Sequence, residues 1–334
     1  MGTHAEAEAR YVLGVDSGGS GIRCAVVRVD GGGGDGPPVG PVVSSTPVRT
    51  GPGGIDAGHL REQLVPAARE LLARSGGRGF AAVCVGAAGM ATLGDDLRAR
   101  LPGMLEAEFG VRRVALAGDA VTAYAGALGA RPGAVVAAGT GLIGIGTDLA
   151  RWRRADGWGH LLGDCGGGAW IGRAGLEAAM RAFDGRDGGS AALLARLEDV
   201  FGPAAGLPGQ LYPRGDRPAV LASFAPEVAA CAGTDAVAQG ILREAAGHIA
   251  ATAAAVCPAG GGDVAFTGGL LKLGAPLLEP LAAEVAARLP GARLRQAAGD
   301  PLDGALLIAS MLAKGGPAFP CDSHMLHVSG HQTR

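Results

Sequence analysis

Two glycine-rich turns, about half a chain apart, constrain most strongly what this sequence can fold into. Residues 12–21 read VLGVDSGGSG and residues 135–144 read VVAAGTGLIG, so each turn lies between two apolar runs. This pattern predicts a tight turn between two strands. Residues without a Cβ atom let backbone N–H groups approach a phosphate closely. One such turn is most often only a hairpin, but two of them could grip one phosphate chain.

The length and charge of the chain limit its number of domains and its kind of partner. A chain of 334 residues exceeds what one hydrophobic core usually holds, which predicts two domains or one domain with a large elaboration. Hydrophobic residues make up 48% and charged residues 18%, as in a globular protein. The net charge of −2, without a basic cluster interleaved with aromatics, argues against nucleic acid and anionic membrane as partners. A small-molecule partner is favoured.

The cysteines and the chain ends suggest a cytoplasmic protein. The six cysteines are dispersed and form no C-x-x-C pair, so neither a disulfide framework nor a structural zinc site is predicted. The N-terminal residues lack the apolar core of a signal peptide, and no long uncharged stretch is uninterrupted. Near the other end, Cys321, His324, His327 and His331 have spacings that could hold a metal, but such polar tails are usually mobile. We expect residues 317–334 to be a mobile tail.

The order of predicted elements occurs twice along the chain. The first half predicts strands within 11–29, near 42–48, at 80–85 and at 114–116, with helices at 60–73, 97–109 and 119–128. After residue 133 the chain begins again with two strands around residues 139–141 and a third near 150–154. The second half adds helices near 168–183, 191–201 and 226–256, a Pro/Gly-rich stretch at 202–218 and a strand at 264–267. This recurrence indicates a duplicated α/β architecture.

The first turn carries residues suited to phosphate chemistry. Asp16 ends the first strand, where its carboxylate could hold Mg²⁺ directly or through water, or simply cap the turn. Ser20 can donate its hydroxyl to a phosphate and Arg23 could supply positive charge during transfer, although both are also ordinary turn and surface residues. The chain contains neither a P-loop sequence nor the protein-kinase motifs, so another architecture must account for these turns.

Asp119 is the candidate general base. It follows the apolar run VALAG and begins a helix, a place where Asp is favoured as an N-cap. The end of a strand in an open α/β sheet also faces the crevice where ligands bind, and a carboxylate there could accept the proton of a substrate hydroxyl. Both roles remain open on the pattern alone.

Two further glycine-rich segments predict ligand contacts. Residues 158–172 (WGHLLGDCGGGAWIG) place Asp164 among six glycines, and its two oxygens could bind vicinal sugar hydroxyls rather than only cap a loop. Trp158 or His160 could shape the pocket, and we favour no role for His160. Gly268 and Gly269 follow a short strand and could admit an adenine or a ribose, or form a plain turn.

Six motifs, in this order, resemble the N-acetylglucosamine kinase branch of the sugar kinase/Hsp70/actin superfamily, within the BadF/BadG/BcrA/BcrD-type (benzoyl-CoA reductase activator) ATPases. They are DSGGSG at Asp16, GDA at Gly118, AGTG at Ala138, WGHLLGD at Trp158, TGG at Thr267 and PLDGALLIA at Pro301. The WGHLLGD segment and the order of the motifs are specific, whereas single glycine turns are weak. The resemblance implies two actin-like (ribonuclease H-like) α/β domains around an ATP/sugar cleft. Its expected domains are residues 1–129, completed by about 303–316, and residues 130–302 with helical insertions.

The resemblance also implies ATP and Mg²⁺ as cofactors and transfer of the γ-phosphate to the 6-hydroxyl of a hexosamine. The partners would be ATP and N-acetylglucosamine, glucosamine or an N-acetylmuramic-type sugar. By matching motifs, the resemblance implies that Asp119 is the catalytic base and that Asp16 is linked to Mg²⁺. It implies phosphate contacts at Gly18, Gly19, Ser20, Arg23, Gly139, Thr140 and Gly141, and adenosine contacts at Gly268 and Gly269. It implies sugar contacts at Trp158, Gly159 and Asp164, together with Asp119 and Thr140. The oligomeric state is not readable, and a homodimer is the commonest assembly for a soluble enzyme of this size.

Three departures from the family pattern leave the sugar open. Residues 49–56 have glycines where sugar-binding relatives carry an Asn, Cys165 and Gly167 replace the Glu and Ser of a D-E-G-S run, and Leu142 replaces a Ser. A buried polar group without a partner costs about 1–3 kcal/mol, so a different amino sugar is an alternative. Two other functions remain: an ATPase that activates a radical dehydratase or reductase, for which Cys165 is the candidate iron–sulfur ligand, and a non-catalytic actin-like ATP-binding protein.

Overall fold

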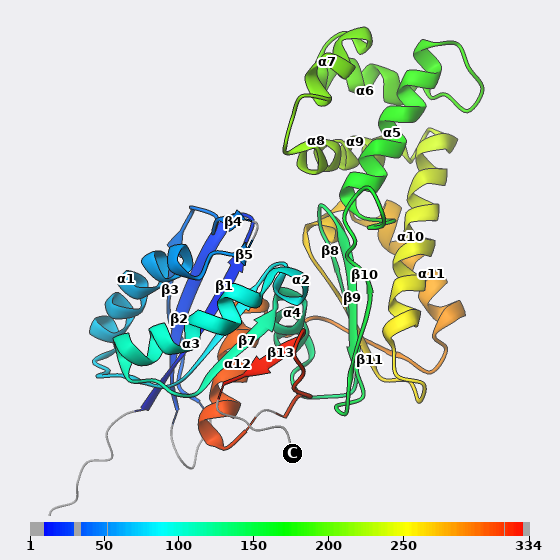
Figure 1. Ribbon diagram of the computed structural model, residues 1–334. Coiled ribbons are helices and arrows are strands. Elements are labelled where there is room, and N and C mark those ends of the chain that lie inside the picture. The colour runs from blue at the N-terminus through cyan, green and yellow to red at the C-terminus, as the bar shows by residue number, and fades with distance from the viewer. Residues whose placement is uncertain (1–9, 30–34, 52, 317, 330–334) are drawn as a thin grey trace, which may run out of the picture. The chain divides into compact units, whose positions relative to one another are not determined.

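The structure, a computed structural model, describes residues 10–29, 35–51, 53–316 and 318–329. Two compact units make up the chain. Unit 1 comprises Met1–Arg131, Asp148–Trp152 and Ala297–Arg334, and unit 2 comprises Pro132–Thr147 and Arg153–Gln296. Each unit is built on one main sheet flanked by helices (Figure 1). The predicted duplicated α/β fold is therefore present, while the predicted domain boundaries stay a prediction.

The sheet of unit 1 has six strands in the order β13-β7-β6-β1-β2-β3. Their bounds are β1 Arg10–Gly18, β2 Gly21–Val29, β3 Val39–Ser44, β6 Phe80–Ala87, β7 Val114–Gly118 and β13 Leu326–Val328. Strands β1, β6 and β7 are parallel, and β2 pairs antiparallel with β1 across the first glycine turn. A small hairpin, β4 Thr50–Gly51 and β5 Gly54–Ile55, follows β3. The parallel strands direct their carboxyl ends to one edge of the sheet.

Side chains alternate between the two faces of the unit 1 sheet, as strand geometry requires. Leu13 and Val15 belong to the core formed with helices α1 Ala57–Ser75 and α3 Asp95–Phe109, near the short α2 Met90–Leu93. Gly14, between them, faces the other helix layer, α4 Asp119–Leu128 and α12 Pro301–Lys314 (Figure 1). A Cβ atom on Gly14 would lie 2.7 Å from the Leu306 side chain, so glycine lets α12 lie close to β1.

Helices α4 and α12 touch through their backbones. A Cβ atom on Gly126 would collide with the carbonyl oxygen of Asp300, and one on Gly304 would collide with the carbonyl oxygen of Thr122. Such close packing fixes the relative positions of the two helices, because neither can rotate without a backbone clash. It therefore fixes Asp119, at the start of α4, relative to Asp300, which caps α12.

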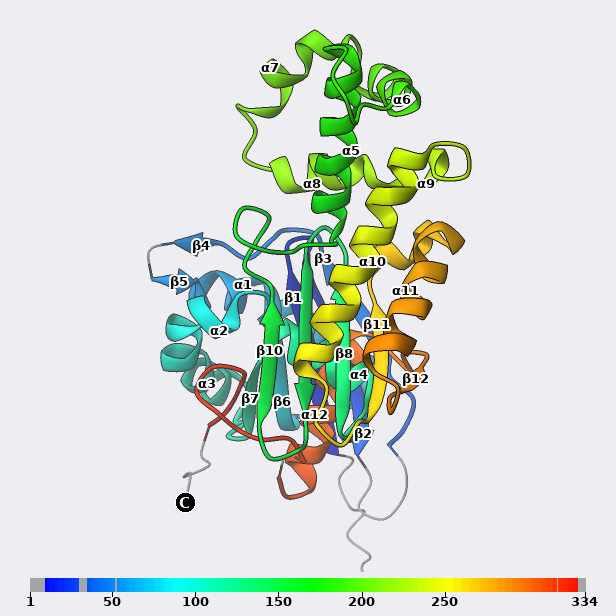
Figure 2. The same cartoon turned by 90° about the vertical axis from the view of Figure 1, so that its right-hand side faces the viewer.

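The sheet of unit 2 has five strands in the order β10-β9-β8-β11-β12. Their bounds are β8 Gly133–Ala138, β9 Leu142–Thr147, β10 Trp152–Asp156, β11 Asp263–Thr267 and β12 Arg293–Arg295. Helices α10 Ala236–Val256 and α11 Ala275–Arg288 cover one face, and η2 Gly269–Leu273 follows β11 (Figure 2). A helical group beyond the end of the sheet comprises α5 Gly168–Phe183, α6 Ala191–Phe201, η1 Ala204–Gly206, α7 Leu207–Leu211, α8 Arg217–Ser223 and α9 Ala225–Cys231.

Several elements differ from their predicted bounds for local reasons. The third strand lies at Val39–Ser44 and accepts Pro41 because it pairs only with β2, at an edge of the sheet. The Pro/Gly-rich stretch contains η1, α7 and the start of α8, and Pro208 and Pro218 fit there because each lies in the first turn of its helix. The long helix predicted for residues 226–256 is two helices separated by residues 232–235.

The C-terminal segment, which we expected to be a mobile tail, supplies a strand. Strand β13 pairs antiparallel with β7, and the amide of Gly118 donates to the carbonyl of Met325 at 2.9 Å. Upstream, the Trp152 indole stacks on Phe319, with ring centroids 5.6 Å apart, and donates to the carbonyl of Pro320. His331 lies outside the described residues, and the described part of the chain contains no group of three or more His, Cys, Asp or Glu side chains that could hold a metal.

No single helix in the described ranges combines the length and hydropathy needed to cross a bilayer. Among the described residues, the segments Arg217–Cys231 and Ala236–Val256 meet that criterion as a pair, and they are bent by 119° at their junction.

Candidate functional site

The β1–β2 hairpin places Asp16 opposite Arg23 as register partners. Both Nε and Nη2 of Arg23 donate to the Oδ2 atom of Asp16, at 3.1 and 2.7 Å. The Asp16 side chain is 18% exposed, so this ion pair is partly withdrawn from water. The pairing orients the Asp16 carboxylate beside the glycine turn.

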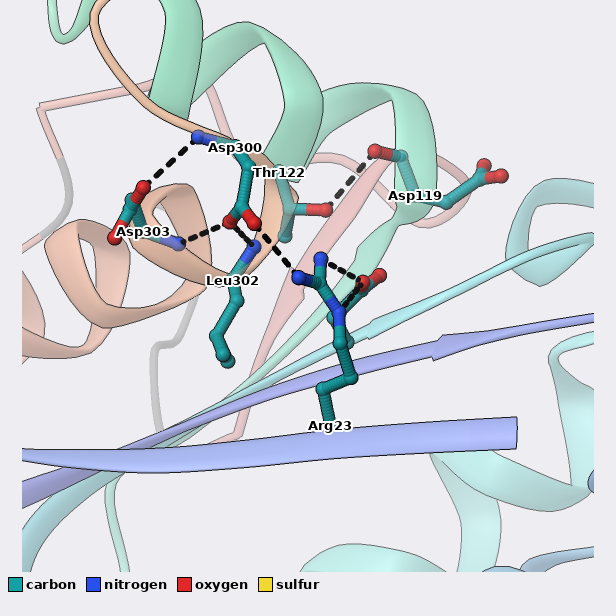
Figure 3. Close-up of polar contacts among 7 residues, drawn as sticks. Arg23, Asp119, Thr122, Asp300, Leu302 and Asp303 are labelled. Atoms are coloured by element: carbon teal, nitrogen blue, oxygen red, sulfur yellow. Dashed lines mark hydrogen bonds and ion pairs between the residues drawn. The ribbon is translucent and has the colours of Figure 1, made fainter. Parts of the chain in front are cut away.

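The same Arg23 guanidinium binds a second carboxylate, which sequence reasoning did not identify. Its Nη1 atom donates to Oδ2 of Asp300 at 2.7 Å (Figure 3). Burial lowers the pKa of Arg23, but its hydrogen bonds to the two carboxylates outweigh this effect and raise that pKa overall. For Asp300, burial raises the pKa, while the Arg23 guanidinium and the backbone donors Asp303 and Leu302 lower it below its ordinary value. Both residues are therefore held in their charged forms.

The glycine turn itself presents open backbone. A Cβ atom on Gly18 or Gly19 would meet no atom within 4 Å, and Ser20 is exposed. Gly21, by contrast, has a φ of 122°, and a Cβ atom there would collide with the carbonyl of Ser44. The turn is thus anchored at Gly21 and accessible at the preceding three residues, as a phosphate-binding backbone must be.

The donor set at Asp16 fits a hard divalent cation. Oδ2 is occupied by Arg23, whereas Oδ1 makes no hydrogen bond or ion pair with any residue that the structure describes. Mg²⁺ prefers oxygen ligands and is commonly held by one or two carboxylates together with substrate phosphates. Asp16 could hold such an ion, directly or through water, next to phosphates on the turn.

Strand register brings Asp119 to the same sheet edge as Asp16. Asp16 pairs with Gly86 of β6, and Gly86 pairs with Ala117 of β7, two residues before Asp119. Gly118, in an extended conformation, is the N-cap residue of α4, so Asp119 is its first helical residue. The Oδ1 atom of Asp119 accepts the Ala120 amide at 2.9 Å. Arg23, Asp119 and Asp300 all project on one side of the β1–β2 hairpin (Figure 3).

Unit 2 contains the second glycine turn, packed against the start of α5. The amide of Gly168 donates to the carbonyl of Gly139 at 2.8 Å, and the amide of Ala169 donates to the carbonyl of Thr140 at 2.8 Å. A Cβ atom on Gly167 would lie 2.8 Å from the carbonyl carbon of Gly141. Residues 139–141 therefore have a fixed backbone, and the structure brings them together with the WGHLLGD segment.

Asp164 is a buried carboxylate, 9% exposed, held in a left-handed conformation with φ of 57°. Its Oδ1 atom accepts the Gly159 amide at 3.1 Å, and its own amide donates to Oδ1 of Asp156 at 2.6 Å. Burial raises the pKa of Asp164, and the backbone donors Gly159 and Leu142 oppose this effect only in part. A buried carboxylate fixed by backbone contacts is suited to accept hydroxyl donors from a ligand.

The loop before Asp164 exposes apolar side chains. Trp158 is 61% exposed, and the Arg154 guanidinium lies 4.6 Å from its ring centroid. Arg154 also donates to the carbonyl of Gly157 at 2.6 Å, which fixes the base of the loop. Trp158 is therefore a surface residue rather than a core residue, as a ligand-contacting side chain would be.

The TGG segment lies beside the second glycine turn. Thr267 of β11 pairs in parallel with Ala137 of β8, so both strands end at one edge. Gly268 has a φ of 102°, and a Cβ atom there would collide with the carbonyl of Ala138. Gly269 has no atom within 4 Å of a Cβ position, so its surface is open.

Asp156 and Asp300 are the polar residues that sequence reasoning missed. Asp156 has a φ of 60° and begins a D-G turn, a signal that could have marked the residue. Asp300 lies directly before Pro301, and Asp303 follows three residues later, which is a capping-box spacing. The structure confirms that box: Asp300 accepts the Leu302 and Asp303 amides, and Asp303 accepts the Asp300 amide at 2.9 Å.

Comparison with known proteins shows what the chain is similar to. Residues 13–309 match the BadF/BadG/BcrA/BcrD ATPase family. An N-acetylmuramic acid/N-acetylglucosamine kinase from Clostridium acetobutylicum is 29% identical over 184 residues, which are 53% of this chain and 56% of the relative. The matched segment thus spans about half the length of that curated relative.

Solved structures share the fold. A crystal structure from Chromobacterium violaceum, provisionally described as an N-acetylglucosamine kinase, is 28% identical with a TM-score of 0.70, and the match covers 91% of this chain and 99% of that one. A similarly described protein from Porphyromonas gingivalis is 20% identical with a TM-score of 0.61, covering 89% of this chain and 97% of that one. A glucokinase of the ROK family from Streptomyces griseus, solved with glucose and AMPPNP, is 22% identical with a TM-score of 0.51, covering 91% of this chain and all of that one. The fold is that of the actin-like sugar kinases, as expected.

Proposed function

The chain belongs to the BadF/BadG/BcrA/BcrD ATPase family, and on this premise we propose that it is an ATP-dependent hexosamine kinase. The proposed reaction transfers the γ-phosphate of ATP to the 6-hydroxyl of an amino sugar. The observation that carries the proposal is the strand register that puts Asp119 and Asp16 at the same carboxyl edge of one sheet. A metal-linked carboxylate and a proton acceptor at one edge are what phosphoryl transfer to an alcohol requires.

Asp119 would act on the acceptor. As the sugar oxygen forms its bond to the γ-phosphorus and the bond to the leaving ADP breaks, the hydroxyl proton passes to the Asp119 carboxylate. Its place as the first residue of α4, after the extended Gly118, holds it at the strand end. The packing of α4 against α12 at Gly126 and Gly304 limits its movement, which favours a fixed attack geometry.

The two glycine turns would bind the nucleotide. In unit 1, the open backbone at Gly18 and Gly19 and the hydroxyl of Ser20 would donate to phosphate oxygens. Mg²⁺ held near Asp16 would offset charge on the β- and γ-phosphates. In unit 2, Gly139, Thr140 and Gly141 would serve the phosphates, with Gly268 and Gly269 at the adenosine.

The loop around Asp164 would recognise the sugar. A carboxylate that is 9% exposed and held by backbone donors can accept vicinal hydroxyl groups in a fixed direction. Trp158 and Gly159 would contact the ring, and Thr140 would lie between phosphate and sugar. The named activity of the Clostridium acetobutylicum relative makes N-acetylglucosamine and N-acetylmuramic acid the first candidates, with glucosamine as the third.

The test measures ADP release by the wild type and by Asp119→Asn in the presence of ATP, Mg²⁺ and each amino sugar of a panel. We expect sugar-dependent ADP release, and a loss of kcat by a factor of about 10²–10⁴ in the variant. The matched control is Asp184→Asn, which replaces an exposed carboxylate at the end of α5 and should retain turnover. Full turnover by Asp119→Asn would refute the base assignment. Sugar-independent hydrolysis by a brown, iron-containing protein would instead support an activator ATPase.

A further inference from the structure

Every guanidinium nitrogen of Arg23 donates to a carboxylate. Nε and Nη2 bind Oδ2 of Asp16, and Nη1 binds Oδ2 of Asp300 (Figure 3). These three side chains come from β1, β2 and the cap of α12, and Asp300 lies 277 residues from Arg23 in the chain. We name them the Arg23 clamp. A guanidinium shared in this way is directed at two carboxylates rather than at solvent.

The clamp sets the direction of the Asp16 carboxylate. A carboxylate group turns easily about its terminal bond, because that torsion has broad minima. Two donors from one planar guanidinium on Oδ2 remove this freedom and leave Oδ1 as the oxygen available to a cation. The direction of Oδ1 therefore depends on where Arg23 is held.

Asp300 ties the clamp to the backbone. Its Oδ1 atom accepts the backbone amides of Leu302 and Asp303. Its other oxygen is thereby aimed at Arg23. Helix α12 is in turn fixed against α4 at Gly126 and Gly304. Although Asp300 is 48% exposed, its side chain does not move freely, because both of its oxygens are engaged.

We propose that Arg23 and Asp300 are positioning residues that orient Asp16 toward the metal–nucleotide complex, an inference that rests on the proposed function. Arg23 then acts through Asp16 and not as a direct phosphate ligand. This reading replaces the phosphate contact that the family resemblance implied for Arg23. It predicts that weakening the clamp impairs binding of the divalent cation and leaves binding of metal-free nucleotide nearly unchanged.

Three variants separate charge from helix capping. Asp300→Asn keeps a good N-cap for α12 but removes the negative charge opposite Arg23. Asp303→Ala removes the acceptor for the Asp300 amide and leaves the Arg23 clamp intact, so it is the matched control. Arg23→Lys supplies a single ammonium, which cannot bridge both carboxylates as the fork of Arg23 does.

The measurement uses Mn²⁺ as the probe cation and the full chain saturated with ADP. Free Mn²⁺ is followed by electron paramagnetic resonance, and ADP affinity without metal is measured by calorimetry. Replacing a residue that orients a metal ligand typically costs a factor of about 10 to 100 in metal affinity. We therefore expect Asp300→Asn and Arg23→Lys to weaken Mn²⁺ binding by about tenfold, with Asp303→Ala close to wild type.

Four results would overturn the inference. They are wild-type Mn²⁺ affinity in Asp300→Asn, an equal loss in Asp303→Ala, an equal loss of metal-free ADP affinity in Arg23→Lys, and no ADP-dependent Mn²⁺ site in wild type. The proposed function is tested separately by sugar phosphorylation. If clamp variants weaken Mn²⁺ binding as expected but the wild type phosphorylates no amino sugar, the proposed function alone is contradicted. If the wild type phosphorylates an amino sugar but Asp300→Asn binds Mn²⁺ as tightly as the wild type, the inference alone is contradicted.

Discussion

The Oδ2 atom of Asp164 lies over the α-carbon of Gly141, in the space that a Cβ atom would need. Two segments that the sequence presents as separate motifs are thus in direct contact within unit 2. The contact explains why the second glycine turn requires a residue without a side chain at position 141. It also places the buried carboxylate against the backbone that we assign to phosphate and sugar binding.

The first prediction concerns this contact. Gly141→Ala should displace Asp164 and lower the free energy of unfolding by about 1–3 kcal/mol, the usual cost of overpacking. Amino-sugar affinity should fall with it. Gly247→Ala, inside α10 with no atom within 4 Å of its Cβ position, is the control and should raise stability by about 0.5–1 kcal/mol. Urea unfolding of both variants is the measurement, and unchanged stability with unchanged sugar affinity in Gly141→Ala would refute the assignment.

The second prediction concerns α4 and α12. Gly304→Ala puts a methyl group against the carbonyl of Thr122, so the helices must separate. We expect a loss of about 1–3 kcal/mol in the free energy of unfolding and a lower kcat, because Asp119 starts α4. Gly103→Ala in α3, where a Cβ atom meets nothing within 4 Å, should not destabilise the protein. Equal stability of the two variants would show that the helix contact can adapt.

The third prediction is a pH dependence. Burial raises the pKa of Asp164, so the folded state binds a proton more readily than the unfolded state. The ionised carboxylate therefore costs stability at neutral pH, and this cost disappears as pH falls below the unfolded-state pKa. Asp164→Asn should be more stable than wild type at neutral pH, with a difference that shrinks in acid. Chemical denaturation at several pH values measures it, and a difference that grows in acid would contradict the account.

The fourth prediction tests whether the C-terminal strand is part of the fold. Leu326 is fully buried in β13, against β7, so Leu326→Ala should cost about 2–5 kcal/mol. Leu294 in β12 is 53% exposed, and Leu294→Ala should change stability by less than about 0.5 kcal/mol. Denaturant unfolding distinguishes the two. A negligible effect at Leu326 would mean that β13 contributes nothing to unit 1.

The sequence predicted what local patterns encode. Apolar runs around glycine turns predicted the β1–β2 and β8–β9 hairpins, and Asp119 was placed correctly after a buried strand and at a helix start. The proposed roles of Asp119, Asp164 and the glycine turns are still predictions. The sequence pattern placed each of these residues at a strand end, a turn or a helix start, but it did not determine what each residue does.

The sequence did not reveal what depends on distant contacts. Asp300 pairs with Arg23 across 277 residues, and no periodicity encodes such a pairing. Strand β13 has three residues and is defined by its partner β7, because so short a segment has no pattern of its own. Asp156 accepts the amide of Asp164, eight residues later, and both residues have left-handed backbones that the sequence pattern did not indicate.

The central claim is tested most directly by phosphorus NMR of the product formed from ATP, Mg²⁺ and N-acetylglucosamine, N-acetylmuramic acid or glucosamine. The account predicts a phosphomonoester on the 6-oxygen of at least one of these sugars, formed in equal amount with ADP and lost in Asp119→Asn. Inorganic phosphate as the sole product with every sugar, at the same rate in both proteins, would contradict it.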